Sequence, residues 1–511
     1  MRRFFKWLFS WRTARRALIG FAIFVTLVAL VITEENWRGK HAWEKFKREW
    51  EAKGERFDRA SVVPSPVPDD QNFALTPIVA SCYLHELDKN GHQIQPPLTN
   101  IVNRLKMEIA YNNDSPTNGF GNWQKSTVSN LKVLQQYYRA LAEKTNEFPV
   151  PAQAQSPAAD VLLALSKYDS AIEELRQASK LPYSRFPLGY DRKDPWAISL
   201  SYLSAFKGCT RVLQLRAIAE LQNGQGDKAL EDVKLMMRLV DSMRTEPLLI
   251  SHLVRIALVN IALQPVWEGL AKHKWSDAQL VELDRELARL DFLADYKLAM
   301  RGEMALCQGG AFEFLRHPPK QLPNMSSKID SLIGIIRRLI PNGWVYQSEL
   351  RCARPMVELF IPAADVNHGI ISPTAARHAD AAIAAETKHT TLFNIWEKLL
   401  MPALGSAVKK FASAQSSVDL ARVGIALERY RLMRGAYPES LDALAPQFIA
   451  KLPHDVINGQ PLKYHRTTDG RFILYSVGWN ETDDGGIVGL KESGSVDINM
   501  GDWVWTYPAR Q

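Results

Sequence analysis

Glu303 and Glu313, in the predicted helical domain, are candidate side chains for acid–base chemistry. Hydrolysis of a glycosidic bond requires a pair of carboxyl groups, one as the proton donor and one as base or nucleophile. Most glutamates on helices, however, are solvated or salt-bridged. Motifs of serine hydrolases, zinc proteases, P-loop proteins and dinucleotide-binding proteins are absent. The sequence therefore favours a protein that is not an enzyme, with a cell-envelope polymer hydrolase as the alternative.

Four cysteines lie far apart in the sequence, at Cys82, Cys209, Cys307 and Cys352. They form neither a C-x-x-C pair nor a Cys/His cluster with the spacing of a metal site. A disulfide is permitted outside the cytoplasm. Cys209 and Cys307 fall in helical patterns, where the favoured role is a small buried hydrophobic side chain. The sequence gives no particular pairing.

The cellular compartment in which these residues act depends on an uncharged stretch at residues 17–33, ALIGFAIFVTLVALVIT. It is just long enough for a helix that crosses the hydrocarbon core of a bilayer. Residues 1–33 contain six Lys and Arg residues and no acid, and such positive flanks stay in the cytoplasm. We predict one transmembrane helix in a bacterial inner membrane, with residues 1–16 inside and the bulk of the chain outside.

The alternative interpretation of this stretch is a cleaved signal peptide. Its apolar part is long for that role, and no A-x-A-like cleavage site follows it. A buried core helix is disfavoured by the six cations beside it. The uncleaved anchor is therefore the preferred interpretation, with the lipid bilayer as the partner of residues 17–33.

The same N-terminal cations explain most of the charge of the chain. They supply six of the eight net positive charges of the 511 residues. The remainder carries only a small excess, which argues against a nucleic-acid partner, because such a partner needs a basic face on the folded domain. With 46% hydrophobic residues, the exported part can bury a large core and form more than one domain.

Two segments connect the apolar stretch to the main domain. Residues 34–60 predict a juxtamembrane helix, in which Trp43, Phe46 and Trp50 share one face. This aromatic stripe can rest on lipid headgroups or pack on protein, and packing is the more common case. Residues 61–74 contain three prolines within five residues and predict a stiff linker at a domain boundary.

Residues 75–400 have the pattern of a domain of long helices. The periodicity predicts helices over 160–180, 196–222, 227–243 and 247–272, and another that begins after Ser276. Residues 215–241 resemble one tetratricopeptide-type hairpin, without a repeat around it. The resemblance implies an array of stacked antiparallel helices, which commonly binds peptides or proteins; an irregular helical domain is the alternative. The run LIGIIRRLI at 332–340 predicts a buried amphipathic helix.

The sequence from residue 401 onward predicts a small α+β domain, so the fold class is mainly α with this α+β end. Its landmarks are ALERYRLMRGAYPESLDAL, then Leu452-Pro453-His454-Asp455, then GQPLKY and LYSVGWNETDDGG. This order resembles the globular half of the major, G-type pseudopilins of type II secretion. The resemblance spans about a sixth of the chain and implies a helix followed by short strands.

In that family, a loop after the last of these landmarks binds calcium, so the resemblance implies a Ca²⁺ site here. Asn480, Thr482, Asp483 and Asp484 lie in the matching loop, with Asp497 and Asp502 downstream. Clustered oxygen ligands suit Ca²⁺. The carboxylate spacing differs from the family pattern, and ordinary Asx turns in a solvated loop are the alternative.

The chain as a whole does not follow the pilin pattern. Gly20-Phe21 follows a basic segment as in a prepilin, but Val25 stands where the pilin glutamate belongs. Nearly 400 residues also separate the apolar stretch from the pseudopilin-like block. The layout resembles anchored proteins of planctomycetes and verrucomicrobia, which implies no activity. We predict a membrane-anchored extracytoplasmic scaffold for a protein partner, associated with the envelope or with secretion.

Overall fold

A single helix, α2 (Trp11–Glu51), carries both the apolar stretch and the charged segment after it. The computed structural model describes residues 11–84, 102–110, 116–190, 198–317, 340–391, 394–401, 403–505 and 507. The predicted membrane helix and the juxtamembrane helix over 34–60 are therefore one continuous element that ends at Glu51. No proline separates the two segments, so nothing in the sequence ends the helix at residue 33.

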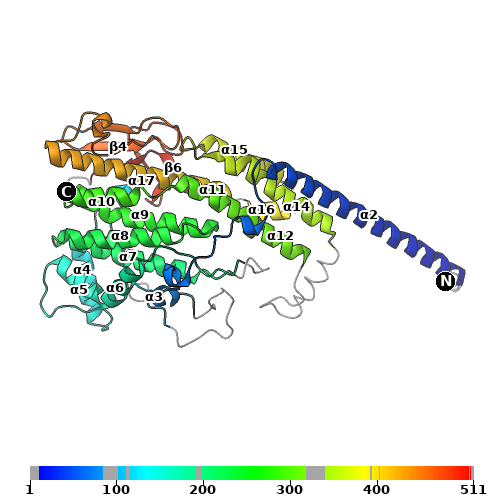
Figure 1. The fold of residues 1–511 in the computed structure, drawn as a ribbon, viewed down its shortest axis with the longest axis horizontal. Helices are drawn as coiled ribbons and strands as arrows, with labels where there is room; N and C mark the ends of the chain where they lie inside the picture. Colours follow the sequence, from blue (N-terminus) through cyan, green and yellow to red (C-terminus); the bar gives the residue numbers. More distant parts are fainter. Residues whose placement is uncertain are drawn as a thin grey trace.

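The apolar half of α2 projects from the rest of the chain (Figure 1). Its most apolar window is long and apolar enough to cross a membrane, and none of it is buried. Helix α9 (Leu249–Ala271) passes the same test of length and composition, but 67% of its apolar window is buried inside the protein. The two helices are thus distinguished by their surroundings, and α9 is a core helix.

The other half of α2 packs against α14 (Asn342–Pro355), a contact that we call the glycine seam. A Cβ atom on Gly39 would lie 2.2 Å from the carbonyl oxygen of Gly343, and one on Gly343 would lie 1.9 Å from that of Glu35. The Gly343 N–H donates to Asn36 Oδ1 at 2.7 Å. Only glycine permits so close an approach of two backbones, so this seam fixes α2 against the domain.

The predicted aromatic stripe of α2 packs on protein. Trp43 and Phe46 are 7% and 4% exposed, and both contact the ring of Phe57, with centroids 5.6 and 5.8 Å away. Of the two alternatives for this stripe, packing is therefore confirmed. It extends the glycine seam with apolar contacts.

The proline-rich segment after α2 lies along the helical region (residues 77–401). It forms three short 3₁₀ turns, η1 (Arg59–Ser61), η2 (Asp69–Gln71) and η3 (Phe73–Leu75), and leads into α3 (Pro77–Ala80). Arg185 Nε donates to the Pro64 carbonyl at 3.1 Å, and the N–H of the buried Phe73 donates to the Tyr183 carbonyl at 2.8 Å. The segment predicted as a linker is thus tied to the domain.

The helical region confirms the mainly α prediction. Its longer helices are α4 (Leu131–Ala142), α5 (Pro157–Leu165), α6 (Asp169–Ala178), α7 (Ser201–Gln222), α8 (Gly226–Ser242), α9, α10 (Asp277–Leu287), α11 (Phe292–Gly302), α12 (Gly309–Arg316), α14, α15 (Pro373–Glu386) and α16 (Ile395–Leu400). The predicted helix over 160–180 is divided into α5 and α6 by a 3₁₀ turn at Ser166–Tyr168. Ser276 caps α10 as predicted. The run predicted at 332–340 lies outside the described residues, apart from Ile340.

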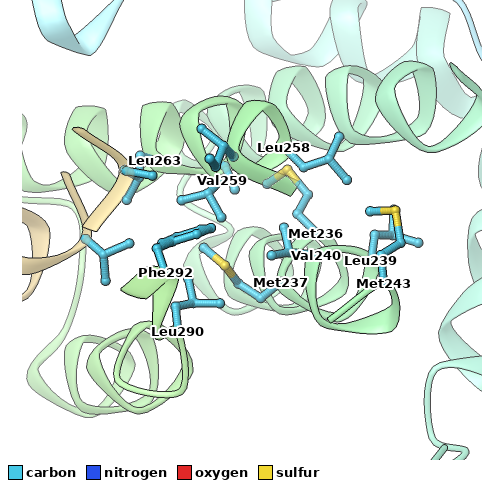
Figure 2. Packing of buried hydrophobic residues seen from close by; sticks show 14 of the residues in the cluster. Met236, Met237, Leu239, Val240, Met243, Leu258, Val259, Leu263, Leu290 and Phe292 are labelled. Atoms are coloured by element: carbon cyan, nitrogen blue, oxygen red, sulfur yellow. The ribbon is translucent and has the colours of Figure 1, made fainter. Parts of the chain in front are cut away.

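The core of the helical region lies where α7, α8 and α9 pack together. Figure 2 shows the layer between α8 and α9, in which Met236, Met237 and Val240 face Leu258 and Val259. Phe292, at the start of α11, closes the layer with Leu290. Burial of these flexible and branched side chains on facing helices supplies the apolar area that stabilises the region.

The C-terminal region (residues 403–507) begins with the long helix α17 (Ala403–Arg434), which packs against α9, α10 and α11. A three-stranded antiparallel sheet follows, in the order β3 (Lys463–Arg466), β4 (Phe472–Ser476), β7 (Trp503–Trp505). Strands β5 (Val488–Leu490) and β6 (Val496–Gly501) form a separate hairpin. Trp505 packs on α17 beside Gly424. The predicted helix is longer than expected, and the small sheets near the C-terminus are confirmed.

Candidate functional site

Three of the predicted calcium ligands lie together: Asn480 and Asp484 in the loop after β4, and Asp502 between β6 and β7. Asn480 Nδ2 donates to Asp484 Oδ2 at 2.8 Å, and the Asp484 N–H donates to Asp502 Oδ1 at 3.3 Å. Asp502 is buried, and its other oxygen accepts from the Gly486 N–H at 2.6 Å. Burial raises the pKa of Asp502 against these two hydrogen bonds. The loop is therefore ordered by its own hydrogen bonds.

The other predicted ligands have separate partners. Asp483 pairs with Lys463 at 3.1 Å and accepts from the Tyr475 hydroxyl at 3.0 Å. Asp497, on β6, accepts from both the backbone and the side chain of Asn499, and the N–H of Thr482 donates to Asn480 Oδ1. Across the described ranges, no group of three or more His, Cys, Asp or Glu side chains is arranged to hold a metal ion. The calcium site remains a prediction.

Glu303 and Glu313 do not form the pair of carboxyls that a glycosidase needs. Glu303 lies in a π-helical turn, η8 (Glu303–Gln308), where burial raises its pKa against a hydrogen bond with the Cys307 thiol. Glu313 lies on α12 and pairs with Arg316 at 3.6 Å. Ten helical residues correspond to about 15 Å along the axis, beyond the ~5–9.5 Å of catalytic pairs. The two acids are therefore too far apart to act together.

A different pair of carboxyls lies close together, between the end of α15 and α16. Burial, followed by the nearby Glu386 carboxyl, raises the pKa of Glu397 to about 7. Neither residue lines the large cleft between the helical region and the C-terminal region. All four cysteines are free thiols, and three of them are buried. Burial raises the pKa of the Cys82 thiol to about 12, which makes it a poor nucleophile.

A large open cleft lies between the helical region and the C-terminal region, with a cavity volume of about 1180 Å³. The helical wall is formed by the loop before α4, the start of α5 and the ends of α7 and α9, and the opposite wall by the end of α17, the β3–β4 turn and Tyr507. Its polar and charged lining residues include Asn118, Ser126, Asn130, Lys132, Gln222, Lys272, His273, Arg431, Tyr437, Asp469, Arg471 and Tyr507.

The backbone at this cleft is strained on the helical wall. Ser126 and His273 have φ values of 56° and 50°, and they are two of the three non-glycine residues with positive φ in the described part of the chain. Side chains disfavour this left-handed conformation, which concentrates at functional sites and costs of order 1–3 kcal/mol. The strain points to a use for the side chains at these positions.

Helices α7 and α9 end in the same backbone motif, but with different residues at its left-handed position. At the end of α7, the Gln225 and Gly224 N–H groups donate to the Glu220 and Leu221 carbonyls. At the end of α9, Lys274 and His273 donate in the same way to Gly269 and Leu270. This is the Schellman motif, in which the left-handed residue is normally glycine. Gly224 follows the rule, and His273 departs from it.

The side chain of His273 reaches a buried carboxylate, Glu428 on α17, with 2.8 Å between Nδ1 and Oε1. Glu428 also accepts both the Nε and Nη2 hydrogen bonds of Arg431 at 2.8 and 2.7 Å and one from the Tyr437 hydroxyl at 2.9 Å. Tyr437 in turn contacts the hydroxyl of Tyr507. Four donors fill the acceptor sites of one carboxylate.

This network keeps Glu428 ionised. Burial alone would raise its pKa, but the hydrogen bonds from Arg431, His273 and Tyr437 outweigh burial and hold the pKa below its ordinary value. A carboxylate with four donors and a lowered pKa is a poor general base or nucleophile. Glu428 therefore fixes the residues around it instead of acting on a substrate.

Charged side chains come from both walls of the cleft. Four lining residues are Lys or Arg, namely Lys132, Lys272, Arg431 and Arg471, and one lining residue is acidic, Asp469. Three of these cations are paired with acids: Lys272 with Glu268 at 3.7 Å, Arg431 with Glu428 at 2.7 Å and Arg471 with Asp469 at 3.5 Å. The cleft is therefore polar, with its charges largely balanced by these pairs.

Sequence reasoning did not find this site. Glu428, Arg431 and Tyr437 all belong to the segment ALERYRLMRGAYP, which carried the pseudopilin resemblance. These residues lie three to nine positions apart near the end of a helix, and such spacing is a usable signal of a shared site. The sequence around His273 contains no comparable signal. No known protein family, curated protein or solved structure matches this chain.

Proposed function

We propose that this protein is a membrane-anchored, extracytoplasmic scaffold that holds a protein partner in the cleft between its two regions. The anchor is the apolar half of α2, which is entirely exposed and has arginines before it and glutamates after it. This charge pattern favours a single pass through a bacterial inner membrane with the N-terminus inside. Trp37 supports the placement, because this 68% exposed indole follows the apolar stretch by one helical turn, at the depth of the headgroups.

The glycine seam supports a rigid connection between anchor and domain. A flexible linker after residue 33 would let the domain move freely about its tether. Here α2 continues as a helix for more than four turns beyond the apolar stretch, and its backbone meets α14 at Gly39 and Gly343. The elements that line the cleft, among them α4, α5 and the end of α17, lie at the end of the molecule opposite the projecting half of α2 (Figure 1). A rigid anchor would therefore present the cleft away from the membrane.

The single observation that carries the proposal is the nature of the cleft. It is open and polar, with charged side chains on both walls, and the buried acid beside it, Glu428, is saturated with hydrogen bonds. An enzyme site of the alternative kind would bring acids of raised pKa together in a pocket. Binding between two walls is what this geometry supports best.

Site-specific photo-crosslinking in cells that express the chain tests this function. A photoreactive residue replaces Gln222, which lies in the cleft at the end of α7. The control replaces Lys207, an exposed residue on the same helix but not in the cleft lining. We expect a reproducible protein adduct at position 222 and none at 207. Equal labelling at the two positions, or no protein adduct at 222, would overturn the proposal.

A further inference from the structure

We infer that a second pocket, between α7, α9 and the loop at 120–129, binds a small N-acylated amino acid through its carboxylate, its amide N–H and an apolar acyl group. The pocket has a volume of about 580 Å³, within the ~300–1,000 Å³ typical of small-molecule sites. Among the described lining residues, Ser129 alone is shared with the large cleft. The inference is therefore independent of the proposed scaffold function.

The floor of this pocket is apolar. Six lining side chains are aliphatic or aromatic, and the most buried of them are Trp123, Leu215 and Ile218, at 5% exposure or less. The partly exposed ones beside them are Ile109, Phe120 and Ile261. Removing an apolar group from water onto such a floor is favourable in proportion to the area buried. The floor therefore suits the acyl group of the ligand.

The loop wall is held in place by Gln264 on α9. The Trp123 N–H donates to Gln264 Oε1 at 2.5 Å, and Gln264 Nε2 donates to the Thr127 carbonyl at 3.2 Å. A Cβ atom on Gly121 would lie 2.5 Å from Gln264 Nε2, so glycine permits the loop to lie this close to α9. Because these contacts form the pocket before a ligand arrives, little ordering is left for binding.

Arg211, on the α7 wall, determines the charge of the ligand. It is an exposed residue, and within the described ranges it has neither an ion pair nor a hydrogen bond. None of the described residues that line this pocket is acidic. A planar guanidinium with free donors fits a carboxylate in a bidentate manner. The ligand carboxylate therefore belongs at Arg211.

Asn260, on the α9 wall, lacks a hydrogen-bond donor. Its Nδ2 donates to the Ile256 carbonyl at 3.1 Å, but its Oδ1 is buried and has no partner in the part of the chain that the structure describes. A buried acceptor is expected to be paired, and leaving it unpaired is unfavourable. A purely hydrocarbon ligand would leave it so, whereas an amide N–H of the ligand would pair with it.

Arg211 and Asn260 lie at the same level of the pocket. Each stands eleven residues before the last residue of its helix, and both helices end at the large cleft, with Gln222 and Ala271 in its lining. Helices α7 and α9 also pack against each other. A carboxylate and an N–H held side by side are the α-substituents of an N-acylated amino acid. Its acyl group then extends toward Ile218, about 10 Å from Arg211 along the axis of α7.

Isothermal titration calorimetry on the full-length chain in zwitterionic-lipid nanodiscs tests the inference, with empty nanodiscs as the blank for partitioning. The probe is N-(2-naphthoyl)glycine. Three comparison compounds each lack one feature: its methyl ester lacks the charge, its N-methyl derivative lacks the N–H, and N-acetylglycine lacks the apolar group. We expect the probe to bind and each comparison compound to bind about tenfold more weakly.

Two variants assign the contacts to residues. Arg211→Gln should weaken binding of the probe about tenfold and leave binding of its methyl ester unchanged. Asn260→Leu should remove the preference for the probe over its N-methyl derivative. The control, Lys228→Gln on α8, removes an exposed cation outside the lining of this pocket and should change nothing. Because Arg211 does not line the large cleft, crosslinking at position 222 should be unaffected in Arg211→Gln.

The remaining outcomes contradict the inference. No binding up to millimolar probe, equal affinity for the probe and its methyl ester, or equal effects of Arg211→Gln and Lys228→Gln would each overturn it. A preference for the N–H that persists in Asn260→Leu would remove the amide from the ligand class. Tighter binding of a ten-residue peptide that ends in Phe-Gly would assign the pocket to a chain terminus and overturn the small-molecule class.

Discussion

The molecule has two long contacts between its parts, and they are built in opposite ways. In the glycine seam, α2 meets α14 backbone to backbone, with no room for a Cβ atom at Gly39 or Gly343. In the second contact, which we call the polar seam, α17 meets α9 and α10 through side-chain charges. Its pairs are Arg422–Asp284 at 2.8 Å, Arg429–Asp277 at 2.8 Å and His273–Glu428 at 2.8 Å.

This difference indicates that the two seams have different roles. Where two backbones touch, no space is left for a ligand, so the glycine seam can only hold two elements in a fixed relation. A seam of charges leaves polar groups at the surface and ends in an open cleft. Under the proposed function, the glycine seam serves position and the polar seam serves binding. Substitutions in either seam, and changes of pH, can test this contrast.

The largest effect is expected from Glu428→Ala in the polar seam. The substitution leaves Arg431, His273 and Tyr437 without their common acceptor. Breaking a buried ion pair costs about 3–5 kcal/mol, and partial exposure of Arg431 and His273 reduces the expected loss to about 2–3 kcal/mol. Urea unfolding of the full-length chain in micelles measures it.

The matched control is Glu439→Ala, in the same C-terminal region. Glu439 pairs with Arg466, and its side chain is 85% exposed. A surface pair of this kind contributes less than about 1 kcal/mol. If the two variants lose equal stability, the polar seam has no special role for its buried carboxylate.

The next largest effect is expected from Gly343→Ala in the glycine seam. The new Cβ would lie 1.9 Å from the Glu35 carbonyl oxygen, so α2 and α14 must separate, at a cost of about 1–3 kcal/mol. Exposed lysines and arginines on α2 after residue 33 should then be cleaved faster by trypsin. Gly20→Ala is the control, since nothing lies within 4 Å of its Cβ. Unchanged cleavage in Gly343→Ala would show that the seam does not hold α2.

The sequence predicted the helices that form the two seams better than the seams themselves. Apolar periodicity and local caps predicted α8, α9 and α10, because these signals lie within a few residues of each other. Glu428 and His273 lie 155 positions apart, and Gly39 and Gly343 lie on helices far apart in the chain. No local pattern identifies such pairs, and neither seam appears in the sequence as a motif. The strained φ of His273 is visible only in the fold.

Acid should weaken the polar seam selectively. The folded-state pKa of Glu428 is lowered from an ordinary value of 4.5. Its contribution to stability is therefore complete above pH 4.5 and is lost as the pH falls through the lowered pKa. Each unit of pKa difference corresponds to about 1.4 kcal/mol.

Stability measured between about pH 6 and 3 checks this direction. The wild-type chain and Gly343→Ala should lose stability in parallel, because the glycine seam is unaltered by the titration of Glu428. Glu428→Gln should lose less, since its amide does not titrate. A steeper loss in Glu428→Gln than in the wild type contradicts the assignment.

The smallest effect is expected from calcium, at a contact outside both seams. The loop with Asn480 and Asp484, which bonds to Asp502, touches α15 of the helical region, where Arg377 pairs with Glu481 and donates to the Trp479 carbonyl at 3.2 Å. The loop is already ordered by its own hydrogen bonds, so a bound ion has little left to organise.

If the predicted site exists, a free Ca²⁺ concentration a few times its Kd stabilises the chain by about 1 kcal/mol. Thermal melts of the full-length chain with Ca²⁺ and with chelator measure the shift, and Asp484→Asn should remove it. Identical melts across millimolar Ca²⁺ would leave the loop as an ordinary set of turns, and the polar seam would remain the C-terminal region's one contact predicted to serve a ligand.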